Sequence, residues 1–331
     1  MSDQSFSSNY NPVSGISLLV FALFLFSIQD VVIKYFSDQY SVLLIVFIRG
    51  VIAAILLLLA MRFIKARISL VSRRPYLALA RGLLGFTSYI TYYLAVASLP
   101  LAEVVAIVFS APLFVTAMSA LLLKEQVGLR RWLAVLTGFI GVLIIVGPSG
   151  QFTSLAVWLA FAAAITYASY TVITRYLSWH DHPLTIAFNT TIVFTLASGI
   201  LSLMLAGGII VITSQHPSMV FLARDWTMPE SLHLGLMIFL GFNGALGFYC
   251  MAKAYCVAQA SAIAPFEYTY VLWAIIFGYL FWSEIPRSTT LIGVLVLIGS
   301  SLYIWHRERN LQSESPSSEP SASEILVRKN S

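Results

Sequence analysis

The chain has 331 residues, of which 59% are hydrophobic and only 10% charged, and its formal net charge is +5. Soluble domains carry about 25% charged residues. This composition excludes a water-soluble globule, which could not bury so much apolar surface, and indicates a protein whose solvent is the lipid bilayer. No basic, aromatic-rich stripe of the kind that binds nucleic acid is present, so we expect no nucleic-acid partner.

The two ends of the chain are polar. Residues 1–14 are rich in Ser and Asn, contain no Lys or Arg, and precede two successive apolar runs. We therefore expect a retained cytoplasmic N-terminal segment and not a cleaved signal peptide. From Arg307 onward the chain is rich in Ser, Glu and Pro, which predicts a disordered cytoplasmic tail over residues 307–331.

Between these ends lie apolar runs of roughly 20 residues, the length that crosses a bilayer. They predict an all-α integral membrane protein with ten transmembrane helices. Five are expected in the first half, at 15–36, 42–61, 76–98, 101–123 and 131–147. Five are expected in the second half, at 154–177, 184–206, 232–254, 262–282 and 289–306. The connections are short, except for residues 213–232 between the seventh and eighth helices.

Basic residues collect in the loops on one side of the predicted helices. The loops after the second and fourth helices hold Arg62, Lys65, Arg67, Arg73, Arg74, Lys124, Arg130 and Arg131. Lys and Arg are enriched in cytoplasmic loops of membrane proteins. We therefore expect a multi-pass protein of the bacterial inner membrane with both termini in the cytoplasm.

The ends of the first and sixth predicted helices are alike. Residues 30–37 and 171–178 share a Val, a basic residue, a Tyr and a Ser in register, and Glu125 matches Glu284 later in each half. Five helices per copy is an odd number, so the second copy would lie inverted in the membrane relative to the first. The two inverted five-helix repeats are expected at 15–147 and 154–306.

Several short stretches carry a family resemblance. They are Phe47-Ile-Arg49-Gly50, Arg81-Gly82-Leu83, Leu99-Pro100-Leu-Ala-Glu103, Phe109-Ser110-Ala-Pro112, Leu123-Lys-Glu125 and Arg131-Trp132. In these the chain resembles the drug/metabolite transporter superfamily and its EamA-type members, which have two five-helix domains. The resemblance covers about residues 15–306 and implies transport of a small metabolite such as an amino acid, S-adenosylmethionine or riboflavin. The second copy departs from the first, since Thr190 stands where the first copy has Arg49.

Four ionisable residues lie more than a turn inside predicted helices, where a charge is costly and indicates function. They are Asp30, Arg49, Arg81 and Glu267. The two acids could carry a coupling proton or bind an amine of the solute. The two arginines could hold a carboxylate or phosphate, which a guanidinium binds bidentately. The alternative is structural, with Asp30 paired to Arg49 or Arg81 so that the ion pair locks helices together.

Polar aromatic and amide side chains give a second set of candidates. Tyr89, Tyr170, Tyr268 and Trp273 are expected to line a cavity for a flat or zwitterionic metabolite, with helix packing as the alternative. Asn189 and Asn243 could also line it, or could hydrogen-bond between helices. Tyr92 and Tyr93 lie close to a helix end, and we assign them to the interfacial aromatic belt.

Small residues and prolines suggest how the helices pack and bend. Gly241, Gly244 and Gly247 recur every three residues, which predicts close helix packing. Pro112 and Pro265 interrupt helical hydrogen bonding and could act as hinges or as plain kinks.

No metal site, catalytic residue or cofactor is expected. The stretch His180-Asp181-His182 falls in a connection and is interpreted as a solvated turn. No Gly-rich phosphate loop followed by Lys-Ser/Thr occurs, so transport would not use ATP.

The sequence therefore predicts a secondary transporter that moves an amino acid, an aromatic or a nucleoside-like compound by alternating access. The alternative is an integral-membrane enzyme for an amphipathic or lipid-linked substrate, although no clustered nucleophile, base and metal ligands are seen. The direction of transport, a coupling proton or sodium ion, and the oligomeric state stay open.

Overall fold

The structure is a computed structural model of the chain. It describes residues 12–63, 68–111, 154–178, 180–257 and 269–296, with single positions between 114 and 144, residues 266–267 and residues 298–299. This part of the chain is helical and contains no strand, which confirms the all-α prediction for it. The predicted helix at 131–147 and most of the one at 101–123 lie outside the described residues.

The described helices fall close to the predicted ones. They are α1 (Pro12–Phe36), α2 (Val42–Phe63), α3 (Pro75–Val96), α4 (Leu101–Val108), α7 (Leu155–Ser178), α8 (Pro183–Ala206), α9 (Pro217–Ala223), α10 (Ser231–Val257) and α12 (Thr269–Trp282). Within the described part, α1, α2, α7, α8 and α10 are the five helices long and apolar enough to cross a membrane, and α12 is a shorter apolar helix. Residues 288–296 are also helical.

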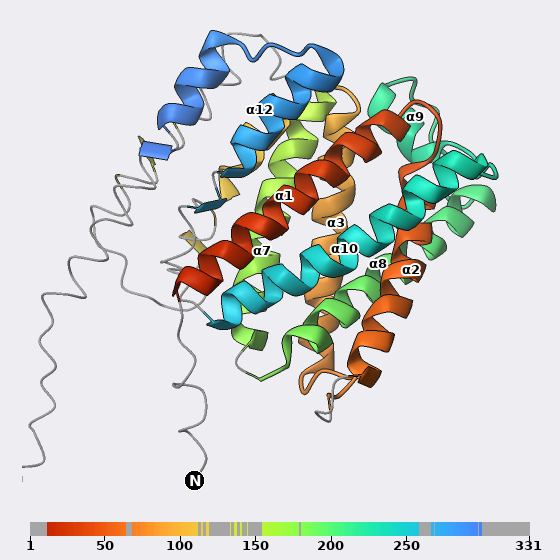
Figure 1. The fold of residues 1–331 in the computed structure, drawn as a ribbon. Helices are drawn as coiled ribbons and strands as arrows, with labels where there is room; N and C mark the ends of the chain where they lie inside the picture. The colour runs from red at the N-terminus through yellow and green to blue at the C-terminus, as the bar shows by residue number, and fades with distance from the viewer. Residues whose placement is uncertain are drawn as a thin grey trace, which may run out of the picture.

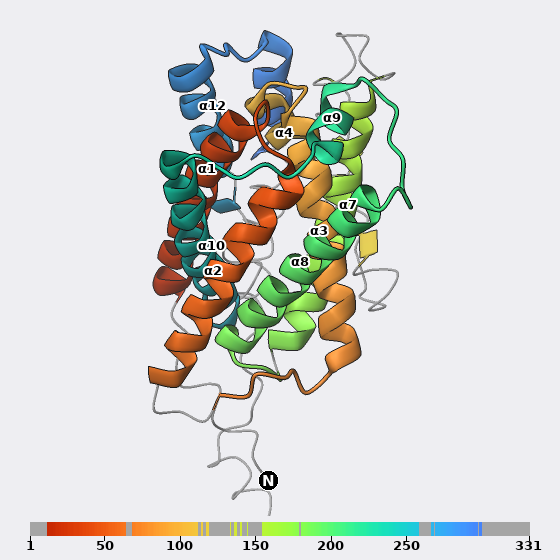
Figure 2. The ribbon, with the colours of Figure 1, turned by 90° about the vertical axis from the view of Figure 1, so that its right-hand side faces the viewer.

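The long helices pack in pairs drawn from the two halves of the chain (Figures 1 and 2). Helix α1 lies along α10, α7 lies along α3, and α2 lies along α8. Helix α10 also contacts α2, α3 contacts α8, α12 contacts α1 and α4, and α4 contacts α7. Each of these helices has a counterpart in the other half of the chain: α1 corresponds to α7, α2 to α8, α3 to α10, and α4 to α12. If every helix is replaced by its counterpart, the same set of contacting pairs is obtained.

Glycines in α10 allow its close approach to α1 and α2. A Cβ at Gly241 would lie 2.6 Å from Cβ of Ile52 and 2.9 Å from the carbonyl oxygen of Arg49. A Cβ at Gly247 would lie 2.6 Å from the ring of Phe26. All three distances are too short for a side chain, so the predicted packing role is confirmed for Gly241 and Gly247.

Helix α9 was not predicted, since the sequence suggested only a connection there. The ring of His216 caps it by accepting a hydrogen bond from the backbone N–H of Ser218. The hydroxyl of Ser218 donates to the carbonyl oxygen of Leu94 and contacts the hydroxyl of Ser98. These bonds fix α9 against the C-terminal end of α3 (Figure 2).

Charged side chains join α1, α4 and α12 at this same end of the bundle. Lys34 Nζ donates to Glu284 Oε1 at 2.5 Å, and Glu284 Oε2 accepts the backbone N–H of Leu101 at 3.0 Å. Ser283 has a φ of 53°, so the chain reverses there and Glu284 lies back over α12. Arg287 Nε lies 3.4 Å from Glu103 Oε1. These contacts hold the ends of α1, α4 and α12 together.

Candidate functional site

A cavity of about 180 Å³ lies among α1, α3, α4, α7, α8, α10 and α12. Most of its wall is apolar, and its polar groups come from distant parts of the sequence. They include Gln29, Arg81, Tyr89, Tyr167, Tyr170 and Glu267. A largely apolar cavity with a few convergent polar groups is the usual form of a small-molecule site.

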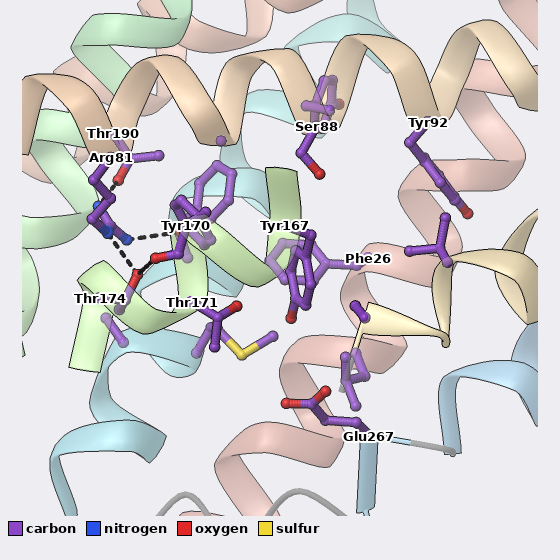
Figure 3. A pocket seen from close by; sticks show the side chains of 18 of the residues that line it. Phe26, Arg81, Ser88, Tyr92, Tyr167, Tyr170, Thr171, Thr174, Thr190 and Glu267 are labelled. Atoms are coloured by element: carbon purple, nitrogen blue, oxygen red, sulfur yellow. Dashed lines mark hydrogen bonds between the residues drawn. The ribbon is translucent and has the colours of Figure 1, made fainter. Parts of the chain in front are cut away.

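Arg81 lies at one side of this cavity, where α3 meets α7 and α8 (Figure 3). Its Nε donates to Thr174 Oγ1 at 2.6 Å and its Nη1 to Thr190 Oγ1 at 2.6 Å. Its Nη2 donates to the hydroxyl of Tyr170 at 2.8 Å, and the guanidinium lies 4.3 Å from the centre of that ring. A Cβ at Gly85 would lie 2.8 Å from the same ring, so glycine is needed for α3 to approach α7 this closely.

The charge of Arg81 has no carboxylate partner among the described residues. The side chain is 3% exposed, and its hydrogen-bond acceptors are neutral hydroxyls and the carbonyl oxygen of Ile186. A buried guanidinium is costly without a counter-charge. An anionic group that entered the cavity would supply this counter-charge.

Glu267 brings a negative charge to the same cavity. Figure 3 shows it on the opposite side from Arg81, with the rings of Tyr167 and Tyr170 between them. These two rings are stacked, with centroids 6.1 Å apart and an interplanar angle of 30°. The cavity therefore offers a cationic end, an aromatic middle and an acidic end.

Asp30 is buried in α1 and is held by three tyrosine hydroxyls. Tyr93 donates to Oδ1 at 2.6 Å, Tyr92 donates to Oδ2 at 2.9 Å, and Tyr270 also donates to Oδ2. All three tyrosines line the cavity, whereas Asp30 does not. The ion pair between Asp30 and an arginine, which was the structural alternative for Asp30, is not found among the described residues.

Arg49 belongs to the same network as Asp30 but reaches it indirectly. It donates to Gln29 and to the hydroxyl of Tyr89, and Gln29 in turn donates to Tyr93 at 3.0 Å. The guanidinium lies 4.4 Å from the ring centre of Tyr89 and is absent from the cavity wall. The two intramembrane arginines therefore differ, because Arg81 faces the cavity and Arg49 is enclosed in the helix packing.

Three other candidates lie away from the cavity wall. The amide of Asn189 donates to the carbonyl oxygens of Leu70 and Thr185, which holds a loop against α8. The amide of Asn243 donates to the carbonyl oxygen of Leu25 and so links α10 to α1. Trp273 packs edge-on against Phe24 at 4.9 Å. Their contacts are those of the structural alternatives named for them.

Tyr268, Pro112 and Pro265 lie outside the described residues.

The assignment of Tyr92 and Tyr93 to an interfacial belt was wrong. Tyr93 is 2% exposed, and both hydroxyls bind Asp30. Their spacing from Tyr89 carries the missing signal, since residues three and four apart share one helix face. Gln29, Thr174, Thr190 and Tyr270 also belong to the site, and the sequence alone did not indicate them.

The turn between α7 and α8 is hydrogen-bonded to the loop that precedes α3. Asp181 accepts hydrogen bonds from the hydroxyl of Ser72 and the backbone N–H of Arg73. The ring of His182 accepts the backbone N–H of Leu184 and caps α8. Across the described residues, no group of three or more His, Cys, Asp or Glu could hold a metal ion.

Comparison with known proteins identifies the family. The model of the EamA-like transporter family matches the chain twice, over residues 13–147 and 154–305. The chain belongs to this family. It is therefore a multi-pass membrane protein of a transporter family, as the sequence motifs suggested.

Relatives of this EamA-family protein are transporters with different named solutes. The S-adenosylmethionine uptake transporter of Rickettsia felis is 27% identical over 304 residues, which cover 91% of this chain and 95% of the relative. The riboflavin transporter of Vibrio cholerae is 29% identical over 316 residues, covering 92% and 99%. The pseudopaline exporter CntI of Pseudomonas aeruginosa is 29% identical over 288 residues, covering 86% and 93%.

A solved crystal structure of another protein has a similar fold. It superposes with a TM-score of 0.63 at 15% sequence identity and covers 90% of this chain and 99% of its own.

Proposed function

We propose that this EamA-family protein is a secondary transporter for a small metabolite that carries an anionic group and a planar ring. The observation that carries the proposal is the buried guanidinium of Arg81, which faces the cavity with neutral hydrogen-bond partners only among the described residues. The carboxylate or phosphate of the solute would bind there. The stacked rings of Tyr167 and Tyr170 would contact its planar part.

The acidic side of the cavity favours a zwitterionic solute. Glu267 lines the cavity across the tyrosine rings from Arg81 (Figure 3), so it is placed to bind an amine of the same molecule. S-adenosylmethionine and riboflavin, the solutes in two relatives' names, both contain planar heteroaromatic rings. An aromatic amino acid meets these requirements, and so does a nucleoside-like compound that carries a carboxylate or phosphate together with an amine.

Asp30 is proposed as the site of a coupling proton. Its carboxylate is separated from the cavity by the three tyrosines that bind it, so it meets the solute only through their hydroxyls. Movement of these tyrosines on solute binding would change the hydrogen bonds of Asp30, and with them its affinity for a proton.

The membrane arrangement proposed for the chain is two inverted repeats, 15–147 and 154–306, with ten helices, both termini in the cytoplasm and alternating access between two faces. The helix pairs that survive exchange of the two halves support this arrangement. Inverted repeats place the solute near the membrane midplane at the interface between the halves.

Reconstitution in proteoliposomes tests the proposal. Uptake of labelled S-adenosylmethionine, riboflavin and the common amino acids would be measured with and without an imposed pH gradient. A hydrogen bond to a charged group contributes about 1.5–3 kcal/mol, so Arg81→Gln should raise KM roughly tenfold to a hundredfold. Arg62→Gln, at an exposed arginine of α2, is the control and should leave KM unchanged. An Arg81→Gln protein with wild-type KM for a transported solute would contradict the proposal.

A further inference from the structure

A second cavity, of about 500 Å³, lies at the end of the bundle where α8 ends. It is separate from the cavity that Arg81 lines. Its wall combines the first half of α2, the end of α8, the segment that follows α8 and the end of α9, which lie in the same upper part of Figure 2. The residues that line it include Phe47, Leu203, Val211, Arg224, Asp225 and Trp226.

An apolar face of α8 leads to this cavity. Leu196, Ile200 and Leu203 lie four and three residues apart, so they share one side of the helix. They are 59%, 58% and 74% exposed, and Val211 beyond the end of α8 is 74% exposed. In a protein that crosses a membrane, exposed apolar side chains of this kind contact lipid acyl chains. The cavity is thus reached along a lipid-facing surface.

Arg224 places a positive charge at the end of this apolar face. It follows α9 directly, and α9 is fixed by the hydrogen bonds of Ser218 and by the hydroxyl of Ser41, which donates to the carbonyl oxygen of Leu222. The Nη1 atom of Arg224 is buried and has no hydrogen-bond partner among the described residues. A buried guanidinium nitrogen without an acceptor is costly, and it indicates that a ligand supplies the acceptor.

The other groups in the cavity suit the membrane interface. Trp226 packs against Phe47 with ring centroids 5.2 Å apart, and tryptophan is enriched at the level of the lipid headgroups. Asp225 lines the cavity beside Arg224 and is exposed, and no ion pair between the two is found in the described part of the chain. A cation, an acid and an indole therefore meet where the apolar face ends.

We propose that this cavity is a phospholipid site. The phosphodiester binds the guanidinium of Arg224, and an acyl chain lies along Leu196, Ile200 and Leu203. Asp225 is placed to bind a headgroup amine such as that of ethanolamine. A small hydrated anion would fit this site poorly, because much of the wall is apolar and is continuous with the lipid-facing side of α8. Basic pockets at the ends of membrane helices recognise headgroups by the same chemistry.

Thermal unfolding of the full-length protein in detergent micelles tests the site with three probes. Didecanoyl phosphatidylethanolamine carries phosphate and chains, didecanoylglycerol carries chains alone, and glycerophosphoethanolamine carries the headgroup alone. The complete lipid should raise the unfolding temperature in a saturable way, and the two fragments should not. Arg224→Gln should weaken the apparent affinity for the complete lipid about tenfold, since a charge-assisted pair is lost.

Two further variants keep the test decisive. Arg73→Gln, at an exposed arginine in a different loop, should bind the lipid as wild type does. Leu203→Ser removes apolar contact at an exposed position and should weaken lipid binding without affecting the fold, which covers the case in which Arg224→Gln does not fold. The proposal is overturned if neither Arg224→Gln nor Leu203→Ser weakens the lipid effect. It is also overturned if glycerophosphoethanolamine alone stabilises the protein as well as the complete lipid, since the site would then take a free phosphate compound.

Discussion

Substitution of Gly241 by Ala tests whether glycine controls the packing of α10 on α2. The new Cβ would lie 2.6 Å from Cβ of Ile52 and 2.9 Å from the carbonyl oxygen of Arg49. Carbon atoms pack comfortably at about 3.5 Å or more, so the two helices would have to separate by roughly 0.5–1 Å. A backbone oxygen cannot rotate away as a side chain can. Overpacking of this kind costs about 1–3 kcal/mol, while replacing a helical Gly by Ala returns about 0.5–1 kcal/mol.

Two glycines of the same helix provide matched controls. A Cβ at Gly235 would meet nothing within 4 Å, and a Cβ at Gly244 would make an ordinary contact at 3.7 Å with Arg49 Cζ. Gly235→Ala should therefore be neutral or stabilising by up to about 1 kcal/mol, and Gly244→Ala nearly neutral. Gly241→Ala should be the least stable of the three by about 1–3 kcal/mol in equilibrium unfolding in mixed micelles. Equal stability of Gly241→Ala and Gly235→Ala would refute the reasoning.

Two further predictions concern hydrogen bonds at buried and capping positions. Tyr93→Phe removes the hydroxyl that donates to Asp30 and accepts from Gln29. Hydrogen bonds in membrane proteins contribute about 0.6–1.7 kcal/mol each, so this variant should lower the free energy of unfolding by about 1–2 kcal/mol. A variant as stable as wild type would show that the network does not stabilise the fold. Burial, and secondarily the charge of Lys253, lower the pKa of His182 from its ordinary value of 6.5. As the pH falls, His182 is protonated at a higher pH in the unfolded chain than in the folded protein. The stability that neutral His182 provides is therefore present above pH 6.5 and is lost as the pH falls through the lower pKa of the folded protein. His182→Asn keeps a capping acceptor and should flatten this part of the stability profile; an unchanged profile would exclude His182 as its source.

Composition and apolar run length predict most of the helices, because a backbone in lipid must satisfy its hydrogen bonds within a helix. The starts and ends of α1, α2, α7 and α8 follow from where apolar residues give way to polar ones. Helix α9 does not follow from this rule. It has seven residues, and its position depends on the hydrogen bond from Ser218 to Leu94, two residues that lie far apart in the sequence.

The roles of the two intramembrane arginines could not be separated from the sequence. Arg49 and Arg81 both lie inside apolar helices, and either could have faced a cavity. Their difference arises from neighbours on other helices. Thr174 and Thr190 accept hydrogen bonds from Arg81 at the cavity wall, whereas Gln29 accepts one from Arg49 between packed helices. Such contacts depend on how closely the helices approach one another, which a single amino-acid sequence does not reveal.

The most direct test of the account is a stabilisation screen of the purified protein against a panel of metabolites. A ligand at 100 times its Kd should add about 2.7 kcal/mol to the free energy of unfolding. We expect the stabilising compounds to combine a carboxylate or phosphate with a planar ring, and their effect to fall sharply in Arg81→Gln but not in Arg62→Gln. Stabilisation by compounds that lack an anionic group, or an equal effect in wild type and Arg81→Gln, would contradict the assignment of Arg81 as the anion-binding residue.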